Sequence, residues 1–205
     1  EEIGKNRRPK GLLAAFRSRS RDFKGYRITG GRICAPSDDW FTKDPVRLLE
    51  IFHLAEEEGL EIHPATIRMV RRDAVLVDAA LRHAPRANAL FLQVLAGRRD
   101  PETVLRWMNE AGVFGRFVPD FGKVNAQMQF DMYHHYTVDE HTIRAIGLLS
   151  RIERRELEQD HPLATELIPK LAHRRVLYVA TLLHDIAKGR NGDHSVLGAE
   201  LALRL

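Results

Sequence analysis

The chain has 205 residues, of which 44% are hydrophobic and 29% are charged, a composition that excludes a largely disordered protein. With 32 Lys and Arg against 28 Asp and Glu, the formal net charge is +4, too balanced for a chain that binds nucleic acid over its whole surface. No apolar run approaches the roughly 18 residues that a membrane-spanning helix needs.

The N-terminal residues and the cysteine content indicate the cellular compartment of the protein. Residues Glu1 to Lys10 are polar and charged, unlike a secretory signal. The single cysteine, Cys34, cannot form a disulfide within the chain, which fits a reducing compartment. We therefore expect a cytoplasmic protein without a membrane partner.

The positive charge is concentrated at the start of the chain. Residues 1–32 contain ten basic and three acidic residues, a net charge of +7. Such a segment can bind phosphate-rich partners, but a solvated tail or a seam left by trimming a longer protein is the commoner explanation. We expect no nucleic-acid partner.

One β-hairpin is predicted, close to this basic segment. Tyr26, Ile28 and Ile33 flank the pair Gly30–Gly31, a pattern typical of two short strands joined by a tight turn. The remainder of the sequence predicts helices, so the expected fold class is all-α, mainly helical, with a short N-terminal β-hairpin.

Several of the predicted helices begin at a proline. Asp44–Pro45 and Asp100–Pro101 combine a capping carboxylate with a proline at the first helical position, and the helices end at Gly59 and Gly112. Apolar residues recur between these limits at three- and four-residue spacing. Three further helices are expected: one from Pro64, one from Asp73 to a stop at Pro85, and one from Asn88 to Ala96.

Aromatic residues, prolines and glycines interrupt the helical pattern near residues 115–130, where we place a module boundary. A second group of helices is predicted after it. These helices span Val138 to about Ile152, Pro162 to Leu171 and His173 to Lys188, with a loop over residues 154–162.

The last of these helices carries the most informative residues. From Val176 to Ala187 it is apolar on every side, which predicts a buried helix. His184 and Asp185 nevertheless lie near its end, and a buried carboxylate needs a cation or hydrogen-bond donors. A salt bridge from Lys188 or an arginine would satisfy Asp185, and a metal ion would satisfy both residues.

Two other polar groups could meet this pair. Asp139, Glu140 and His141 open the helix that starts at Val138, and His194 follows a glycine-containing turn. Imidazole nitrogens and carboxylate oxygens suit Mn²⁺, Fe²⁺ or Zn²⁺, and Mg²⁺ where carboxylates and water dominate. Spacing alone leaves coincidence as an alternative, because the chain has ten histidines.

Longer strings of residues resemble known sequences. Tyr133 to Thr142, Leu183 to Gly189 and Gly192 to Ser195 resemble an HD-type phosphohydrolase motif. Phe117 to Gly122, Gln127 to Tyr133 and Asp44 to Leu49 resemble one family in particular, the PII uridylyltransferase/uridylyl-removing enzymes of bacterial nitrogen regulation. This resemblance extends from about Gly11 to the end of the chain.

The resemblance implies a domain organisation. In that family a nucleotidyltransferase domain attaches UMP to a tyrosine of the PII signalling protein, an HD domain removes it by hydrolysis, and C-terminal domains sense glutamine. Residues 1–33 would be the trailing edge of the transferase domain or a basic linker, residues 34–125 a helical linker domain, and residues 126–205 the N-terminal part of a truncated HD domain. The transferase site and the glutamine-sensing domains would lie outside this chain.

The same resemblance implies residue roles. His141, His184 and Asp185 would bind a divalent metal ion, Mn²⁺ or Mg²⁺, with Fe²⁺ or Zn²⁺ as further candidates. Lys188 would offset the charge of the phosphate, and His194 would join a second metal or donate to the phosphate. His134 or His135 is a weaker candidate for a general acid, while Asp139 and Glu140 fit charges at a helix N-terminus better than metal ligands.

The family pattern also includes a later aspartate as fourth ligand. Only Asp193 follows Asp185, and it is too close in sequence for that role, so we expect this chain alone to be a largely inactive hydrolase of uridylylated PII. Two alternatives stay open: an HD phosphatase or cyclic phosphodiesterase joined to a tRNA nucleotidyltransferase, and an HD scaffold without catalytic function.

Overall fold

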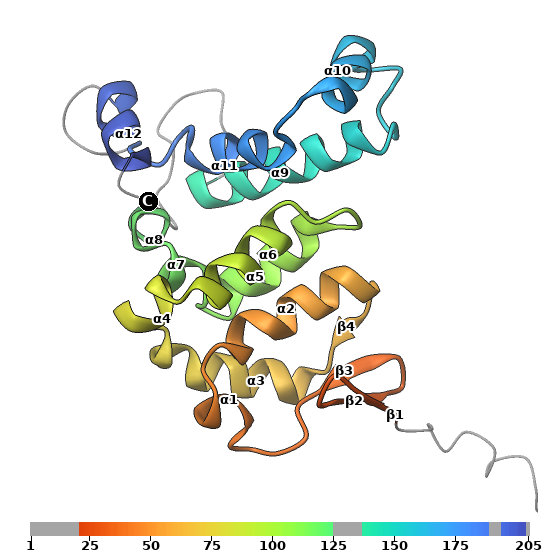
Figure 1. The fold of residues 1–205 in the computed structure, drawn as a ribbon, viewed down its shortest axis with the longest axis vertical. Helices are drawn as coiled ribbons and strands as arrows, with labels where there is room; N and C mark the ends of the chain where they lie inside the picture. Colours follow the sequence, from red (N-terminus) through yellow and green to blue (C-terminus); the bar gives the residue numbers. More distant parts are fainter. Residues whose placement is uncertain (1–20, 125–136, 189–193, 204–205) are drawn as a thin grey trace, which may run out of the picture.

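The chain folds into a small sheet followed by two groups of helices (Figure 1). The computed structural model describes residues 21–124, 137–188 and 194–203. Residues 21–124 form the lower body in Figure 1, and the helices of the later residues lie across its top. The prediction of a mainly helical protein with strands near the N-terminus is confirmed.

The sheet extends the predicted hairpin on both sides. Its strands are β1 (Arg21–Phe23), β2 (Tyr26–Thr29), β3 (Arg32–Cys34) and β4 (Glu61–Ile62). The first three are antiparallel, and β4 runs parallel to β3 with Ile33 paired to Ile62. Gly30 and Gly31 have φ of +59° and +76°, the left-handed conformation that a two-residue hairpin turn requires. Strands as short as β1 and β4 show no alternation in the sequence, so neither was predicted.

The first group of helices encloses a core with the sheet. It consists of α1 (Trp40–Lys43), α2 (Arg47–Glu58), α3 (Pro64–Asp73), the 3₁₀ turn η1 (Ala74–Leu76), α4 (Ala79–His83), α5 (Pro85–Leu95), α6 (Pro101–Glu110), α7 (Phe114–Phe117) and α8 (Pro119–Val124). The predicted starts at Pro64 and Pro101 are confirmed, and the Asp100 carboxylate accepts a hydrogen bond from the Thr103 amide. Gly59 ends α2 with φ of +66°.

The prediction of one helix over residues 73–85 is wrong, because the chain forms the 3₁₀ turn η1 and then a separate helix, α4. Asp78 starts a new helix, α4, and its carboxylate accepts a hydrogen bond of 2.9 Å from the Leu81 amide. Pro85 then begins α5 instead of ending the helix before it. A proline at the first helical position sacrifices no helical hydrogen bond, so it marks a start as readily as a stop.

The segment predicted as a link near residues 115–130 contains two short helices, α7 and α8. The rings of Phe114 and Phe121 stack there with centroids 4.1 Å apart, and both side chains are buried. The aromatic residues that interrupt the helical pattern therefore belong to the core of the first group.

The second group consists of α9 (Val138–Glu153), α10 (Pro162–Leu167), the 3₁₀ turn η2 (Ile168–Lys170), α11 (Arg174–Leu183) and α12 (His194–Ala202). The prediction for α11 needs correction, because this helix ends at Leu183 and is not buried on every side. It packs on α9 and α5 with Tyr178 and Leu182 buried, whereas the side chain of Val176 is 63% exposed. An apolar composition allows burial on all sides, but the neighbouring helices decide which face is covered.

Polar contacts connect the start of α9 to α6. Arg106 of α6 pairs with Glu140, and the Asn109 amide donates a hydrogen bond of 2.9 Å to the Asp139 carboxylate. Asp139 and Glu140 thus lie in the first turn of α9, as predicted, and also bind the adjacent helix.

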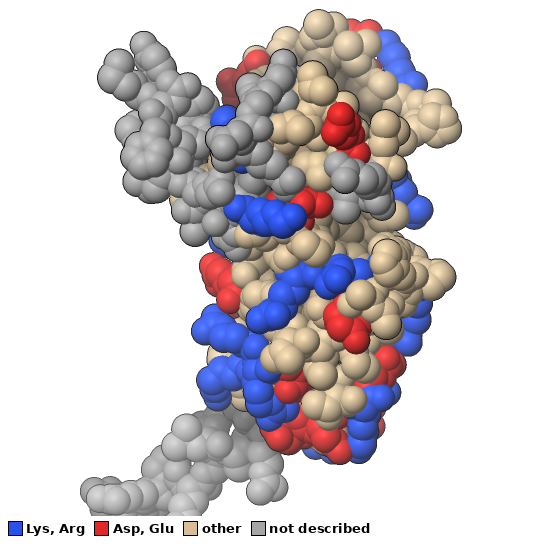
Figure 2. All heavy atoms as spheres, turned by 90° about the vertical axis from the view of Figure 1, so that its left-hand side faces the viewer, with Lys and Arg blue, Asp and Glu red and all other residues tan. Residues whose placement is uncertain are grey.

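The surface carries both signs of charge. On the face drawn in Figure 2, the described Lys and Arg side chains are interspersed with Asp and Glu instead of forming one continuous basic surface. None of the helices in the described ranges combines the length and apolarity that crossing a membrane requires.

Candidate metal centre

Three of the predicted site residues converge on one point of the second helical group. One ligand atom each from His141, His184 and Asp185 lies within 4.8 Å of the other two. His141 Nε2 is 3.8 Å from Asp185 Oδ2, and His184 Nε2 is 3.5 Å from the same oxygen. The two imidazole rings have centroids 5.5 Å apart.

The first turn of α9 positions His141. Its amide donates a helical hydrogen bond to the Thr137 carbonyl. Val138 and Ile143 on the same helix are buried, and the polar contacts of Asp139 and Glu140 hold this turn against α6. The imidazole of His141 is about one-third exposed, so it can be reached from solvent.

The turn after α11 positions the His184–Asp185 pair. Ile186 and Ala187, which follow the pair, are each 1% exposed and anchor the turn in the core. His184 Nδ1 lies 2.6 Å from the Thr181 carbonyl oxygen, so Nδ1 donates a hydrogen bond there, and the neutral ring then carries no proton on Nε2. This contact, which no sequence motif signals, selects the nitrogen that a metal needs.

Lys188 contacts the site through Asp185. Its ammonium donates to Asp185 Oδ2 at 3.2 Å, the salt bridge considered from the sequence. Lys188 lies in the turn after α11 and not in the predicted continuation of the helix, but it still reaches the side where the two imidazoles meet. The Asp185 side chain is only 13% exposed, so this cation offsets a poorly hydrated charge.

The donor set fits a divalent metal ion. Two donors about 2.1 Å from one ion, at tetrahedral or octahedral angles, lie about 3.0–3.5 Å apart. The two separations to Asp185, 3.5 Å and 3.8 Å, are close to that range, and the third pair of donor atoms, within 4.8 Å, would come into it by rotation of the imidazole side chains. Two imidazoles and one carboxylate suit Mn²⁺, Fe²⁺ or Zn²⁺.

The other predicted residues cannot be placed at this centre. His134 and His135 lie outside the described residues, and α12 begins at His194, whose side chain also lies outside them. Asp193, the residue too close in sequence to be the fourth ligand, is likewise not described.

Comparison with known proteins gives the class. Residues 26–117 match the family described as "Uridylyltransferase GlnD third domain", and residues 138–205 match "HD domain". The first match covers strands β2–β4 and helices α1–α7, and the second contains His141, His184 and Asp185. The chain therefore combines a helical GlnD third domain with an HD domain.

Individual relatives narrow this further. The bifunctional uridylyltransferase/uridylyl-removing enzyme of Erythrobacter litoralis is 63% identical over 205 residues, all of this chain. The enzymes of the same name from Novosphingobium aromaticivorans and Azospirillum brasilense are 66% and 52% identical over 97% and 95% of the chain. This chain belongs to the family of bifunctional uridylyltransferase/uridylyl-removing enzymes, as its motifs predicted, and it spans 22% of the length of the first two relatives.

Proposed function

We propose that the HD part of this chain carries the uridylyl-removing site, which hydrolyses the phosphodiester between UMP and a tyrosine of the PII protein. The observation that carries the proposal is the convergence of His141 on α9 with His184 and Asp185 in the turn after α11, within an HD-domain match. The name of the relatives includes a uridylyl-removing activity. The transferase activity would belong to sequence outside this chain.

The proposed reaction is a hydrolysis. A divalent ion, Mn²⁺ or Mg²⁺ in our proposal, supplies Lewis-acid polarisation of a phosphoryl oxygen and activation of water. His141 and His184 would hold it through Nε2, and Asp185 through a carboxylate oxygen. Water attacks the phosphorus, the bond to the tyrosine oxygen breaks, and the products are UMP and the tyrosine hydroxyl.

Further residues and partners are part of the same proposal. Lys188 offsets charge on the phosphate, and His194 donates to it or joins a second metal. Uridylylated PII is the substrate, glutamine regulates the reaction through domains outside this chain, and the protein works in the cytoplasm.

Metal binding to this chain tests the proposal first. Thermal unfolding is recorded with and without Mn²⁺ for the wild type, for His184→Ala, and for His161→Ala, which removes an exposed histidine of the same helical group. An ion stabilises a protein only by preferring the folded state, so Mn²⁺ should raise the unfolding midpoint of the wild type and of His161→Ala but not of His184→Ala. Equal stabilisation of all three would place the ion elsewhere and contradict the site.

Hydrolysis separates the remaining alternatives. UMP release from uridylylated PII is compared with hydrolysis of a 2′,3′-cyclic nucleotide, using this chain and an enzyme of the relatives' length that carries this sequence. UMP release that Asp185→Asn abolishes supports the proposal. Activity on the cyclic nucleotide alone would favour the phosphodiesterase alternative, and metal binding without either activity would favour a scaffold.

A further inference from the structure

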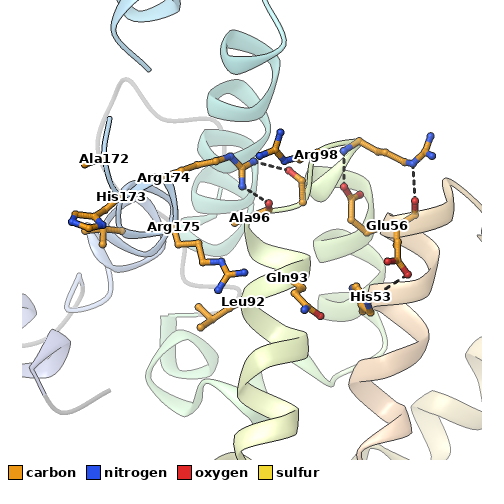
Figure 3. Close-up of a pocket in the computed structure, with 14 residues that line it drawn as sticks. His53, Glu56, Leu92, Gln93, Ala96, Arg98, Ala172, His173, Arg174 and Arg175 are labelled. Atoms are coloured by element: carbon orange, nitrogen blue, oxygen red, sulfur yellow. Dashed lines mark hydrogen bonds and ion pairs between the residues drawn. The ribbon is translucent and has the colours of Figure 1, made fainter. Parts of the chain in front are cut away.

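Arg174, the first residue of α11, connects the two helical groups at the end of α11 away from the metal ligands. It lines a cleft of about 730 Å³ between α2, α5 and the start of α11. Figure 3 shows its side chain extending from α11 to the end of α5, where dashed lines mark its hydrogen bonds to backbone carbonyls.

The guanidinium of Arg174 uses both of its edges. Its Nη1 donates to the Ala96 carbonyl at 2.6 Å and its Nη2 to the Gly97 carbonyl at 3.1 Å, which satisfies acceptors at the C-terminal end of α5. The Nε and Nη2 atoms also bond both carboxylate oxygens of Glu153, the last residue of α9. Tyr178 donates to the same carboxylate at 2.8 Å and lies under the guanidinium, 4.5 Å from ring centre to Cζ.

The carbonyls that accept these bonds lie on a firmly held loop. Glu56 of α2 is 4% exposed, and its two carboxylate oxygens accept hydrogen bonds from the Arg99 and Asp100 amides at 2.6 Å and 3.0 Å. A side chain at Gly97 would collide with Glu56, since an added Cβ would lie 2.4 Å from its Cδ. The Ala96 and Gly97 carbonyls that bind Arg174 are therefore held in a fixed position by the GlnD third domain.

The two helices involved carry the metal ligands at their other ends. His141 lies in the first turn of α9 and Glu153 ends it, while Arg174 begins α11 and His184 follows its last residue. The helices contact each other and run antiparallel, as the pairing of their opposite ends shows. A shift of α11 along α9 would therefore change the distance between His141 and His184.

We infer that Arg174 is a positioning residue, through which the GlnD third domain sets the placement of the HD metal ligands. This inference rests on the proposed function, because it concerns the same metal centre. The contact joins Ala96 and Gly97 in the first matched domain to Arg174 in the second, and a match to one domain alone does not describe it. Only a planar fork of donors meets both carbonyls and the carboxylate at once, so lysine should replace arginine only in part.

The affinity for Mn²⁺ tests the inference. Electron paramagnetic resonance measures the free Mn²⁺ at a temperature well below the unfolding midpoint. Arg174→Ala should weaken binding at least about five-fold and Arg174→Lys less. Arg175→Ala is the matched control, because Arg175 lines the same cleft and its side chain makes no hydrogen bond or ion pair with any residue the structure describes. Ile33→Val, a core truncation in the sheet, controls for general destabilisation. Both controls should stay within about two-fold of the wild type.

A second measurement needs no metal. Hydrogen exchange of the Ile186 and Lys188 amides, which hydrogen-bond within the turn that carries the ligands, should be faster in Arg174→Ala than in Arg175→Ala. Unchanged exchange there, with an effect confined to the first turn of α11, would overturn the inference. Wild-type protein that binds no Mn²⁺ would instead contradict the proposed function, and the exchange result would still decide the role of Arg174.

Discussion

At the scale of single residues, hydrogen bonds and ion pairs within the protein decide which nitrogen and oxygen atoms of the candidate centre can bind a metal ion. The Thr181 carbonyl accepts the Nδ1 proton of His184, so the ring presents Nε2 toward Asp185. Asp185 Oδ2 lies within 4 Å of both imidazoles and also accepts a hydrogen bond from the Lys188 ammonium. The carboxylate oxygen that faces both imidazoles therefore already has a cation beside it.

Replacing Lys188 tests the effect of this cation. Lys188→Met removes a cation that competes for Asp185, so Mn²⁺ should bind about two- to five-fold more tightly. The same change should slow UMP release about ten-fold, because the phosphate loses its nearby cation. Isothermal titration and a UMP-release assay measure the two effects, with Lys170→Met, which removes an exposed helix-surface pair, as control. Weaker Mn²⁺ binding would show instead that Lys188 holds Asp185 in place.

At the scale of elements, the crossing of α6 and α9 decides where His141 lies. Gly147 of α9 faces Glu102 of α6 so closely that an added Cβ would lie 2.7 Å from Glu102 Cβ. The terminal carboxylate could move aside, but the Cβ atom cannot move without its helix. This glycine therefore allows the close approach of the two helices.

Gly147→Ala should lower the free energy of unfolding by about 1–3 kcal/mol, because the helices must separate to admit the methyl group. Alanine is intrinsically better than glycine in a helix, so propensity alone predicts the opposite sign. Gly198→Ala on α12 is the matched control, since its Cβ would meet only Ala187 at an ordinary 3.9 Å. Urea unfolding of both variants measures the difference, and a stable Gly147→Ala would show that α9 has room to shift.

At the scale of the whole molecule, the contact between the two domains is made by Arg174, whose ion pair with Glu153 depends on pH. Burial alone would raise the pKa of Glu153, but the hydrogen bonds from Arg174 and Tyr178 outweigh burial and hold this pKa below its usual value of 4.5. Burial and the Glu153 carboxylate raise the pKa of Tyr178 to about 12. A carboxylate with a lowered pKa stabilises the fold above its unfolded pKa, and this stabilisation disappears as pH falls through the folded pKa.

Glu153→Gln tests this dependence. The wild type should be more stable than the variant at pH 6. The gap should shrink as pH falls below about 4.5, where Glu153 of the unfolded wild type gains a proton, and disappear below the lowered pKa of the folded state. Urea midpoints between pH 6 and pH 3.5 measure the gap. A stability difference that stays constant over this range would mean that the charge on Glu153 does not stabilise the folded protein.

Local signals account for much of what could be predicted. The Gly30–Gly31 turn, the proline starts at Pro64 and Pro101 and the end of α2 at Gly59 follow from backbone preferences of one or two residues. The candidate metal ligands could be named because their residue types and motif strings are distinctive. The errors arose where a local signal has two meanings, as at Pro85.

By itself the sequence determined the helical class, the family and the identity of His141, His184 and Asp185 as candidate ligands. Only the tertiary structure decided that these side chains meet, that Thr181 selects a nitrogen of His184 and that Arg174 joins α11 to α5. It also decided that one face of α11 is exposed. The physical reason is that backbone preferences act between near neighbours in the chain, whereas these contacts join residues that only the packing of helices brings within a few ångströms.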